Sequence, residues 1–245
     1  MNEPFLCGIR LSKPLPKDSY LCDIPAIEWL CGSGELSFSS AVTFFVGENG
    51  SGKSTLLEAI AVSMGFNPEG GSKNYRFSTA DTHSPLSELL TTVKSAFRPS
   101  DGYFLRAESL YNSATYLDSL PQGGIRYGER TLHEQSHGES FLTIIEQRFR
   151  GNGLYLLDEP EAALSPARLL RLLGDIHSLV SDGSQFIIAT HSPILMAYPD
   201  AEILRFSDMG IERTEYIQTE HYQITKQFLD NPQRMLDIIF SSRPE

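Results

Sequence analysis

The stretch from Gly47 to Thr55, GENGSGKST, limits more than any other what this 245-residue chain can fold into. It fits the pattern G-x-x-x-x-G-K-[ST], in which a glycine-rich loop leaves a buried strand and opens a helix. The apolar run AVTFFV precedes the loop, and STLLEAIAVSMGF, with apolar residues at helical spacing, follows it. The sequence therefore predicts a strand, a loop whose backbone N–H groups surround phosphate oxygens, and a helix whose N-terminus adds its dipole.

Every residue of this loop is a candidate contact for a nucleotide phosphate. The pattern assigns Lys53 to the β and γ phosphates and the hydroxyl of Ser54 to Mg²⁺. A glycine-rich turn without a ligand is the alternative, and the flanking strand and helix disfavour it. The expected phosphate contacts are Gly47, Glu48, Asn49, Gly50, Ser51, Gly52, Lys53, Ser54 and Thr55.

Alternating strand and helix patterns predict the fold class. DGYFLRAES, GLYLLDEP and SQFIIATHSP indicate strands, whereas ESFLTIIEQRF and ARLLRLLGDIHSLVS indicate helices. We expect one α/β domain over residues 1–245 with a doubly wound, mostly parallel sheet. Strand signals dominate residues 24–45, a polar loop covers 67–85, and a helix is expected over 86–97. A small helical lobe over roughly 80–140 would be inserted between the glycine loop and the later strands.

Two acids and a histidine follow apolar strands and are candidate catalytic residues. Asp158 and Glu159 end a hydrophobic strand, where an open α/β sheet presents its ligand crevice. We expect Asp158 to hold Mg²⁺ directly or through water, and Glu159 to activate water as general base. His191 ends another strand at the same edge. The alternatives are a solvated acidic turn and a structural histidine.

The segment QSHGE has two interpretations. Ser136 followed by Glu139 and an apolar run forms a capping box, in which each side chain bonds a backbone N–H group at the start of a helix. The second interpretation assigns Ser136 and Gly138 to a phosphate bound on another copy of the chain. These residues alone do not decide between the two.

Composition limits the environment in which the chain works. The N-terminus carries no signal peptide and no apolar stretch is long enough to span a bilayer, so we expect a cytoplasmic protein without membrane insertion. Cys7, Cys22 and Cys31 lack the spacing of a disulfide framework and are expected to be reduced, mostly buried thiols. The formal charge of -11 disfavours nonspecific coating of nucleic acid or anionic lipid, although a local basic groove is compatible with it.

Together the motifs resemble those of the ATP-binding-cassette (ABC) class of P-loop ATPases, in that family's order. GENGSGKST is similar to its Walker A, LYLLDEP to its Walker B with the catalytic glutamate, EAALSP to its D-loop and ATHSP to its switch-histidine loop. QSHGE then resembles the signature motif, with His137 and Glu139 replacing its usual glycine and glutamine. The segment VTFFVGENGSGKSTLLEAIA resembles the corresponding segment of small stand-alone SMC/RecF-like bacterial AAA-family ATPases more than that of transporter subunits.

The resemblance implies that MgATP binds between Walker A of one subunit and the signature of a second identical subunit. ATP would close the homodimer and hydrolysis would open it. Glu108 lies near the place where the family carries its Q-loop glutamine. Tyr20 or Trp29 could stack on adenine, although a core or sheet-surface position is the commoner use of such residues.

Some basic residues could meet phosphates or DNA, but a solvated charged face is the commoner explanation for them. They are Lys73, Arg76, Arg126, Arg130 and Arg148. Three wider roles are left open: an ATPase acting on DNA in repair or phage defence, the nucleotide-binding subunit of a membrane transporter, and an ATP-gated scaffold that recruits an effector protein.

Overall fold

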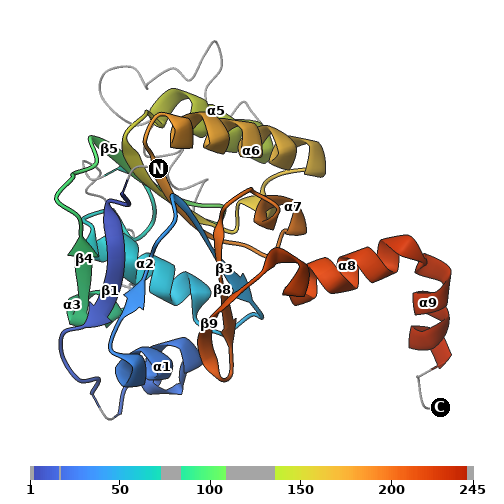
Figure 1. Cartoon of the computed structure of the whole chain (residues 1–245), viewed down its shortest axis with the longest axis horizontal. Helices are drawn as coiled ribbons and strands as arrows, with labels where there is room; N and C mark the ends of the chain where they lie inside the picture. Colours follow the sequence, from blue (N-terminus) through green and yellow to red (C-terminus); the bar gives the residue numbers. More distant parts are fainter. Residues whose placement is uncertain (1–2, 17, 73–83, 109–135, 242–245) are drawn as a thin grey trace.

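A six-stranded sheet forms the centre of the computed structural model, which describes residues 3–16, 18–72, 84–108 and 136–241 (Figure 1). Its strand order is β5-β6-β7-β3-β8-β9, and all neighbours are parallel except β9, which returns antiparallel to β8. The strands are β3 (Val42–Gly47), β5 (Asp101–Arg106), β6 (Gly153–Asp158), β7 (Gln185–Ala189), β8 (Glu202–Ser207) and β9 (Gly210–Thr214). The predicted α/β class and mostly parallel sheet are confirmed.

The central strands are buried on both faces, which explains their continuous apolar runs. Successive side chains enter two separate cores: Phe45 and Leu156 face one, while Phe44 and Tyr155 face the other. Helix α2 (Lys53–Ser63) and α1 (Pro25–Ser33) cover the first face; α5 (His137–Arg148), α6 (Pro166–Ser181) and α7 (Pro193–Met196) cover the second (Figure 1). The sheet is therefore doubly wound.

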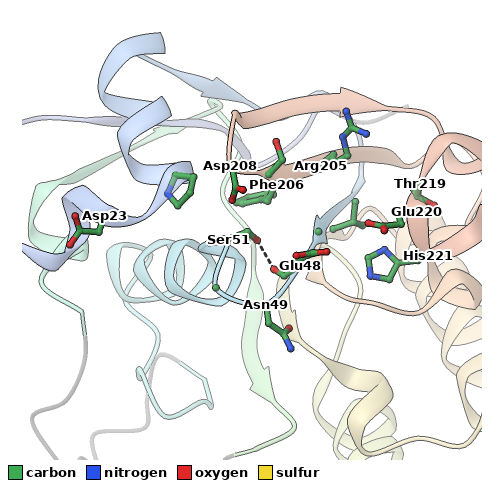
Figure 2. A pocket seen from close by; sticks show the side chains of 15 residues that line it. Asp23, Glu48, Asn49, Ser51, Arg205, Phe206, Asp208, Thr219, Glu220 and His221 are labelled. Atoms are coloured by element: carbon green, nitrogen blue, oxygen red, sulfur yellow. Dashed lines mark hydrogen bonds between the residues drawn. The ribbon is translucent and has the colours of Figure 1, made fainter. Parts of the chain in front are cut away.

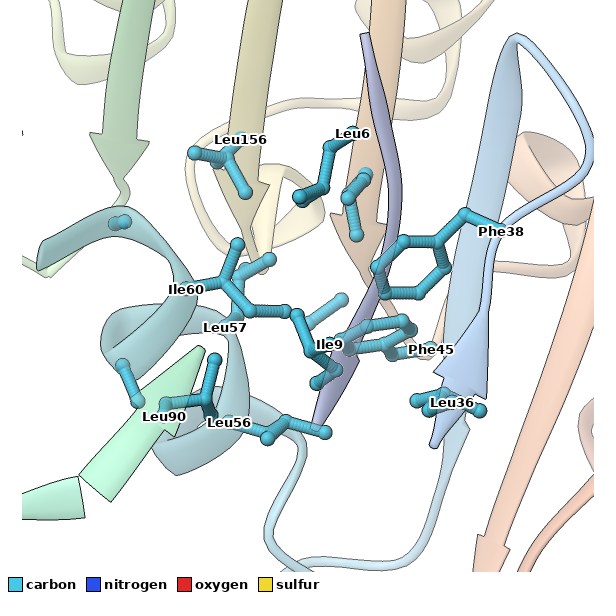
Figure 3. Close-up of a cluster of buried hydrophobic side chains, with 14 of the residues drawn as sticks. Leu6, Ile9, Leu36, Phe38, Phe45, Leu56, Leu57, Ile60, Leu90 and Leu156 are labelled. Carbon is cyan, nitrogen blue, oxygen red and sulfur yellow. The ribbon is translucent and has the colours of Figure 1, made fainter. Parts of the chain in front are cut away.

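A smaller antiparallel sheet packs over α2 and encloses the first core (Figure 3). Its order is β2-β1-β4, formed by β2 (Leu36–Ser37), β1 (Leu6–Leu11) and β4 (Leu90–Lys94). Figure 3 shows Leu6 and Ile9 of β1 directed at Leu57 and Ile60 of α2. These contacts hold the helix that follows the glycine loop against the body of the protein.

Two local predictions are wrong. The helix expected over 86–97 ends after one turn, α3 (Leu86–Leu89), because the β-branched run from Thr91 to Val93 pairs with β1 as strand β4. The strand signals over 24–45 are misleading at their start, where helix α1 begins at Pro25 and ends at Ser33, just before Gly34, a glycine with φ of 83°. Most of the expected lobe at 80–140 lies outside the described residues.

Two helices at the C-terminal end extend away from the sheet. They are α8 (Glu220–Asp230) and α9 (Pro232–Ser241), and Figure 1 shows them projecting beyond the remaining elements. No helix in the described part of the chain is long and apolar enough to cross a membrane. All three cysteines are free, but Cys31 is exposed and the other two are only half-buried, so the expectation that they are mostly buried is wrong.

Candidate functional site

The glycine loop connects the carboxyl end of β3 to the N-terminus of α2. Gly47 and Gly52 have φ angles of 138° and 99°, which side chains rarely tolerate. A Cβ at Gly47 would lie 2.1 Å from the carbonyl oxygen of Phe206, and one at Gly52 would lie 2.5 Å from Ile24. Only glycine fits at these two positions, so the chain can turn tightly between β3 and α2.

Lys53 is folded onto the loop that it follows. Its Nζ donates hydrogen bonds of 2.7 Å to the carbonyl oxygens of both Gly47 and Glu48. The residue is only 4% exposed. Burial lowers the pKa of the amine, while the nearby carboxylates, Glu159 foremost, act in the opposite direction. The amine is thus held against the loop that the sequence predicts to bind phosphates.

A cavity of about 560 Å³ opens beside the loop. Glu48, Asn49, Gly50 and Ser51 line it from the loop side, and β8 and the start of α8 line the other side (Figure 2). The hydroxyl of Ser51 donates to the carbonyl oxygen of Glu48 at 2.8 Å and closes the turn. The cavity is large enough for a nucleoside to extend from phosphates bound in the loop.

Ser54 and Asp158 form the candidate metal site. The hydroxyl of Ser54, in the first turn of α2, donates to Oδ1 of Asp158 at 2.9 Å. Asp158 is 6% exposed, and burial raises its pKa to about 6, against the opposing effects of Arg106 and the Ser54 hydrogen bond. One hydroxyl and one carboxylate oxygen at this distance are the donor set that Mg²⁺ uses beside phosphates. The residues therefore fit the metal that the sequence implies.

Sequence reasoning missed Arg106 and Glu58 beside this pair. The guanidinium of Arg106 lies 3.3 Å from Asp158 and 2.6 Å from Glu58 of α2. Arg106 closes an apolar strand directly opposite Asp158 in the parallel register, which is a signal the sequence contained. Glu58 carried no such signal, because only the position of α2 brings it there.

Glu159 follows Asp158 in an unusual backbone conformation. Its φ of 49° is in the left-handed region, where a residue other than glycine is strained. Its N–H donates to the carbonyl oxygen of Ala189 at 3.0 Å, which ties the acid to the end of β7. The carboxylate Oε1 lies 3.7 Å from Nε2 of His191. The two candidate catalytic side chains therefore face each other.

His191 is fixed by its own loop and by a residue that the sequence did not indicate. Glu161 accepts hydrogen bonds from the backbone N–H of His191 and from the hydroxyl of Thr190. Nδ1 of His191 lies 2.9 Å from Nε2 of His221, in the first turn of α8. No local pattern distinguishes His221, because the two histidines meet only when α8 folds back to the sheet edge.

Ser136 caps α5 as the capping box predicted. Its backbone N–H and its hydroxyl each lie 2.9 Å from Glu139 Oε2. A Cβ at Gly138 would lie 2.5 Å from Arg168 of α6 and 2.7 Å from the carbonyl oxygen of Ala163. Ser136 is exposed, and α5 covers the sheet face opposite to α2. The capping role does not exclude the phosphate role, since a capped helix N-terminus still attracts anions.

The structure separates several other candidates from this site. Tyr20 is largely exposed and its hydroxyl bonds Ser84, while Trp29 packs against Gly210 of β9; neither lines the cavity. Arg148 ends α5, about 18 Å along the helix from Ser136. Glu108 is close enough for its charge to raise the pKa of Asp158. Lys73, Arg76, Arg126 and Arg130 lie outside the described residues.

Comparison with protein families gives two matches. A family described as "AAA domain" matches residues 28–150, half of the chain. A second family, "AAA domain, putative AbiEii toxin, Type IV TA system", matches residues 124–197. The two matches together cover the glycine loop, the acidic strand end and the switch-histidine loop.

Two curated proteins and one solved structure are similar to this chain. The nucleoside import ATP-binding protein NupA of Lactococcus lactis subsp. cremoris (strain MG1363) is 23% identical over 60% of this chain and 32% of its own length. The thiamine import ATP-binding protein ThiQ of Ruegeria sp. (strain TM1040) is 30% identical over 66% of this chain and 76% of its own length. The chain thus spans about a third of the first relative and three quarters of the second.

An inward-facing metal-chelate-type ABC transporter overlays with a TM-score of 0.50 at 16% identity, over 92% of this chain and 88% of that chain. At this identity the overlay concerns the fold alone. It agrees with a P-loop sheet accompanied by an antiparallel subdomain.

Proposed function

We propose, from the premise that the chain belongs to the AAA domain family of P-loop ATPases, that it is an ABC-type ATPase whose two identical subunits bind MgATP between them. The observation that carries this proposal is the convergence of Lys53, Ser54, Asp158 and Glu159 at one edge of the sheet. These are the groups that phosphoryl transfer from a bound nucleoside triphosphate requires.

The residues of this edge divide the work of hydrolysis. When ATP binds, Lys53 would donate to β- and γ-phosphate oxygens instead of the two loop carbonyl oxygens. Its positive charge would then stabilise the negative charge on the phosphoryl group during transfer. Ser54 and Asp158 would hold Mg²⁺, which when bound offsets the charge that develops on those oxygens. Glu159 would accept a proton from the attacking water, and His191 would contact the γ phosphate.

The second half of each site would come from the partner subunit. Ser136 is exposed, sits at a helix N-terminus and belongs to the sheet face that Lys53 does not share. It can therefore meet a phosphate held by another copy more readily than one held by its own loop. Because the γ phosphate would contact both subunits, ATP would favour the closed homodimer and hydrolysis would release it.

A solution mass measurement tests this proposal. Glu159→Gln keeps the shape of the side chain but removes the base, so this variant should double its mass on addition of MgATP and keep it. Ser136→Arg in the same background should bind MgATP and stay monomeric. Light scattering after size exclusion reads both. A monomer in every condition, with nucleotide shown to be bound, would refute the composite site.

Two observations favour different wider roles. The import ATP-binding relatives favour a nucleotide-binding subunit of a transporter, which co-purification with a membrane protein would support. The exposed helices α8 and α9 favour a cytoplasmic scaffold that recruits an effector when ATP closes the dimer. The formal charge of -11 weighs against a role on DNA in repair or phage defence. Retention of DNA that depends on ATP and falls steeply with salt concentration would support that role.

A further inference from the structure

The contact between His191 and His221 determines more than the position of the two rings. A neutral imidazole carries one proton, so one of its nitrogens donates and the other accepts. Nδ1 of His191 and Nε2 of His221 are 2.9 Å apart, so one of them donates to the other. This single hydrogen bond therefore selects the tautomer of both rings.

The surroundings of the other nitrogen of His191 decide the direction of that bond. Nε2 of His191 is buried and makes no hydrogen bond within 3.5 Å among the described residues. It faces Oε1 of Glu159 at 3.7 Å. A carboxylate oxygen only accepts, and so does a phosphate oxygen, so an unprotonated Nε2 would oppose both. The favourable tautomer of His191 carries its proton on Nε2.

Electrostatics keep both rings neutral near pH 7. Burial is the main cause that lowers the pKa of His191, and Lys53 adds to it, while Glu159 opposes it. The pKa of His221 is lowered by burial first and by His191 and Lys53 next. Double protonation of His191 would remove the Nδ1 acceptor that the hydrogen bond needs.

We infer that His221 is a positioning residue: its Nε2–H donates to Nδ1 of His191 and so holds the proton of His191 on Nε2, directed at Glu159 and the γ-phosphate position. The consequence for catalysis rests on the proposed function. The tautomer itself does not, since it is a property of the chain without nucleotide.

The position of His221 in the chain couples this contact to the placement of α8. The residue stands in the first turn of α8, whose later turns project from the body (Figure 1). Its side chain also lines the cavity beside the glycine loop (Figure 2). A displacement of α8 therefore breaks the bond that sets the tautomer of His191.

Nitrogen NMR of the full chain labelled on histidine tests the inference without nucleotide. At pH 8, two-bond correlations distinguish protonated from unprotonated ring nitrogens, and loss of signals in His191→Gln assigns the ring. The expected result is a protonated Nε2 and an unprotonated Nδ1 on His191. A proton on Nδ1 of His191 in the wild-type chain overturns the inference.

Three variants connect the tautomer to turnover. His221→Gln keeps an N–H donor at the same reach and should retain both the tautomer and kcat within about twofold. His221→Leu should give a mixture of tautomers and lower kcat about tenfold, with KM for MgATP little changed. His177→Gln, which changes an exposed histidine on α6, is the matched control and should alter neither.

The outcomes separate the two proposals. If His191 carries its proton on Nε2 but His221→Leu turns over like the wild type, the positioning role is wrong and the ATPase assignment stands. If the wild-type chain shows the expected tautomer but hydrolyses no ATP as monomer or dimer, the proposed function fails and the histidine pair stands.

Discussion

The hydroxyl of Ser54 donates a 2.9 Å hydrogen bond to Asp158, a residue 104 positions later in the chain. This bond joins α2, the helix after the glycine loop, to the carboxyl end of β6. It therefore holds a hydroxyl and a carboxylate side by side in the chain without metal.

The Ser54–Asp158 pair predicts metal-dependent nucleotide binding. Ser54→Ala removes one of the two oxygen ligands, so the affinity for MgATP should fall by roughly ten- to a hundredfold. Affinity for ATP in the presence of a chelator should change little, because the backbone N–H groups remain. Titration with a fluorescent ATP analogue, with Mg²⁺ and with EDTA, measures both. An equal loss under both conditions would contradict the metal role.

Replacing Lys53 should abolish the binding of MgATP without changing the stability of the fold. Because burial lowers the pKa of its amine, the folded state holds this charge at a cost. Lys53→Met keeps the aliphatic stem, so the variant should fold with a melting temperature close to that of the wild type. It should lose the increase in melting temperature that MgATP gives. A thermal-shift assay reads both, and a normal response to MgATP would refute the assignment.

Two helical glycines predict opposite effects of the same substitution. Gly138→Ala forces a Cβ against Arg168 and a backbone carbonyl, so it should destabilise the chain by about 1–3 kcal/mol. Gly174→Ala, on α6, meets no atom within 4 Å and should be neutral or stabilise by up to about 1 kcal/mol. Urea unfolding of both variants compares them directly. Equal destabilisation would contradict the close packing of Gly138 against Arg168 and the carbonyl oxygen of Ala163.

The pair His191 and His221 predicts a loss of stability in mild acid. Both pKa values lie below the ordinary value near 6.5, so the unfolded chain takes up protons before the folded chain does as the pH falls. Their neutral forms thus contribute stability that is complete above about pH 6.5 and is lost as the pH falls through the lowered pKa values.

Melting curves at pH 7.5 and 5.5 check this. On acidification the wild-type chain should lose stability relative to the double variant His191→Gln/His221→Gln. Buried acids with raised pKa values, Asp158 and Glu161, have the opposite sign but are common to both proteins. The charged groups facing the two rings are also shared: Lys53, Glu159, Glu161 and Glu220. A difference that does not change with pH would contradict the prediction.

Local sequence determined the parts of the fold that local forces control. The glycine pattern predicted the loop from Gly47 to Thr55, and the apolar strand before Asp158 predicted that this acid lies at the sheet edge. By contrast, β4 looked helical because LSELL has helical spacing, and only pairing with β1 reveals the strand. An edge strand of this kind is decided by its neighbour rather than by its own pattern.

The same distinction applies to the candidate site. Residues within motifs could be named from the sequence, whereas Glu58 and His221 could not, and Arg106 was indicated only by its place at the end of an apolar strand. Each of these meets its partner only through the tertiary fold, across 30 or more positions. Arg106 nevertheless opposes the rise that burial gives the pKa of Asp158, and His221 bonds the candidate catalytic histidine. A motif therefore identifies the reacting groups, and the fold supplies the groups that tune them.

Helices α8 and α9 have a consequence for exchange of amide hydrogens with solvent. They contain 11 and 10 residues, and apolar side chains on both are exposed, among them Ile224, Phe228, Leu229, Ile239 and Phe240. Helices shorter than about 12–15 residues are marginal in water unless packing supports them. The backbone amides of α9 and of the later turns of α8 should exchange near the rate of free peptides, while those of α2 exchange slowly. The degree of protection at this end of the chain thus becomes a direct gauge of whatever surface comes to cover it.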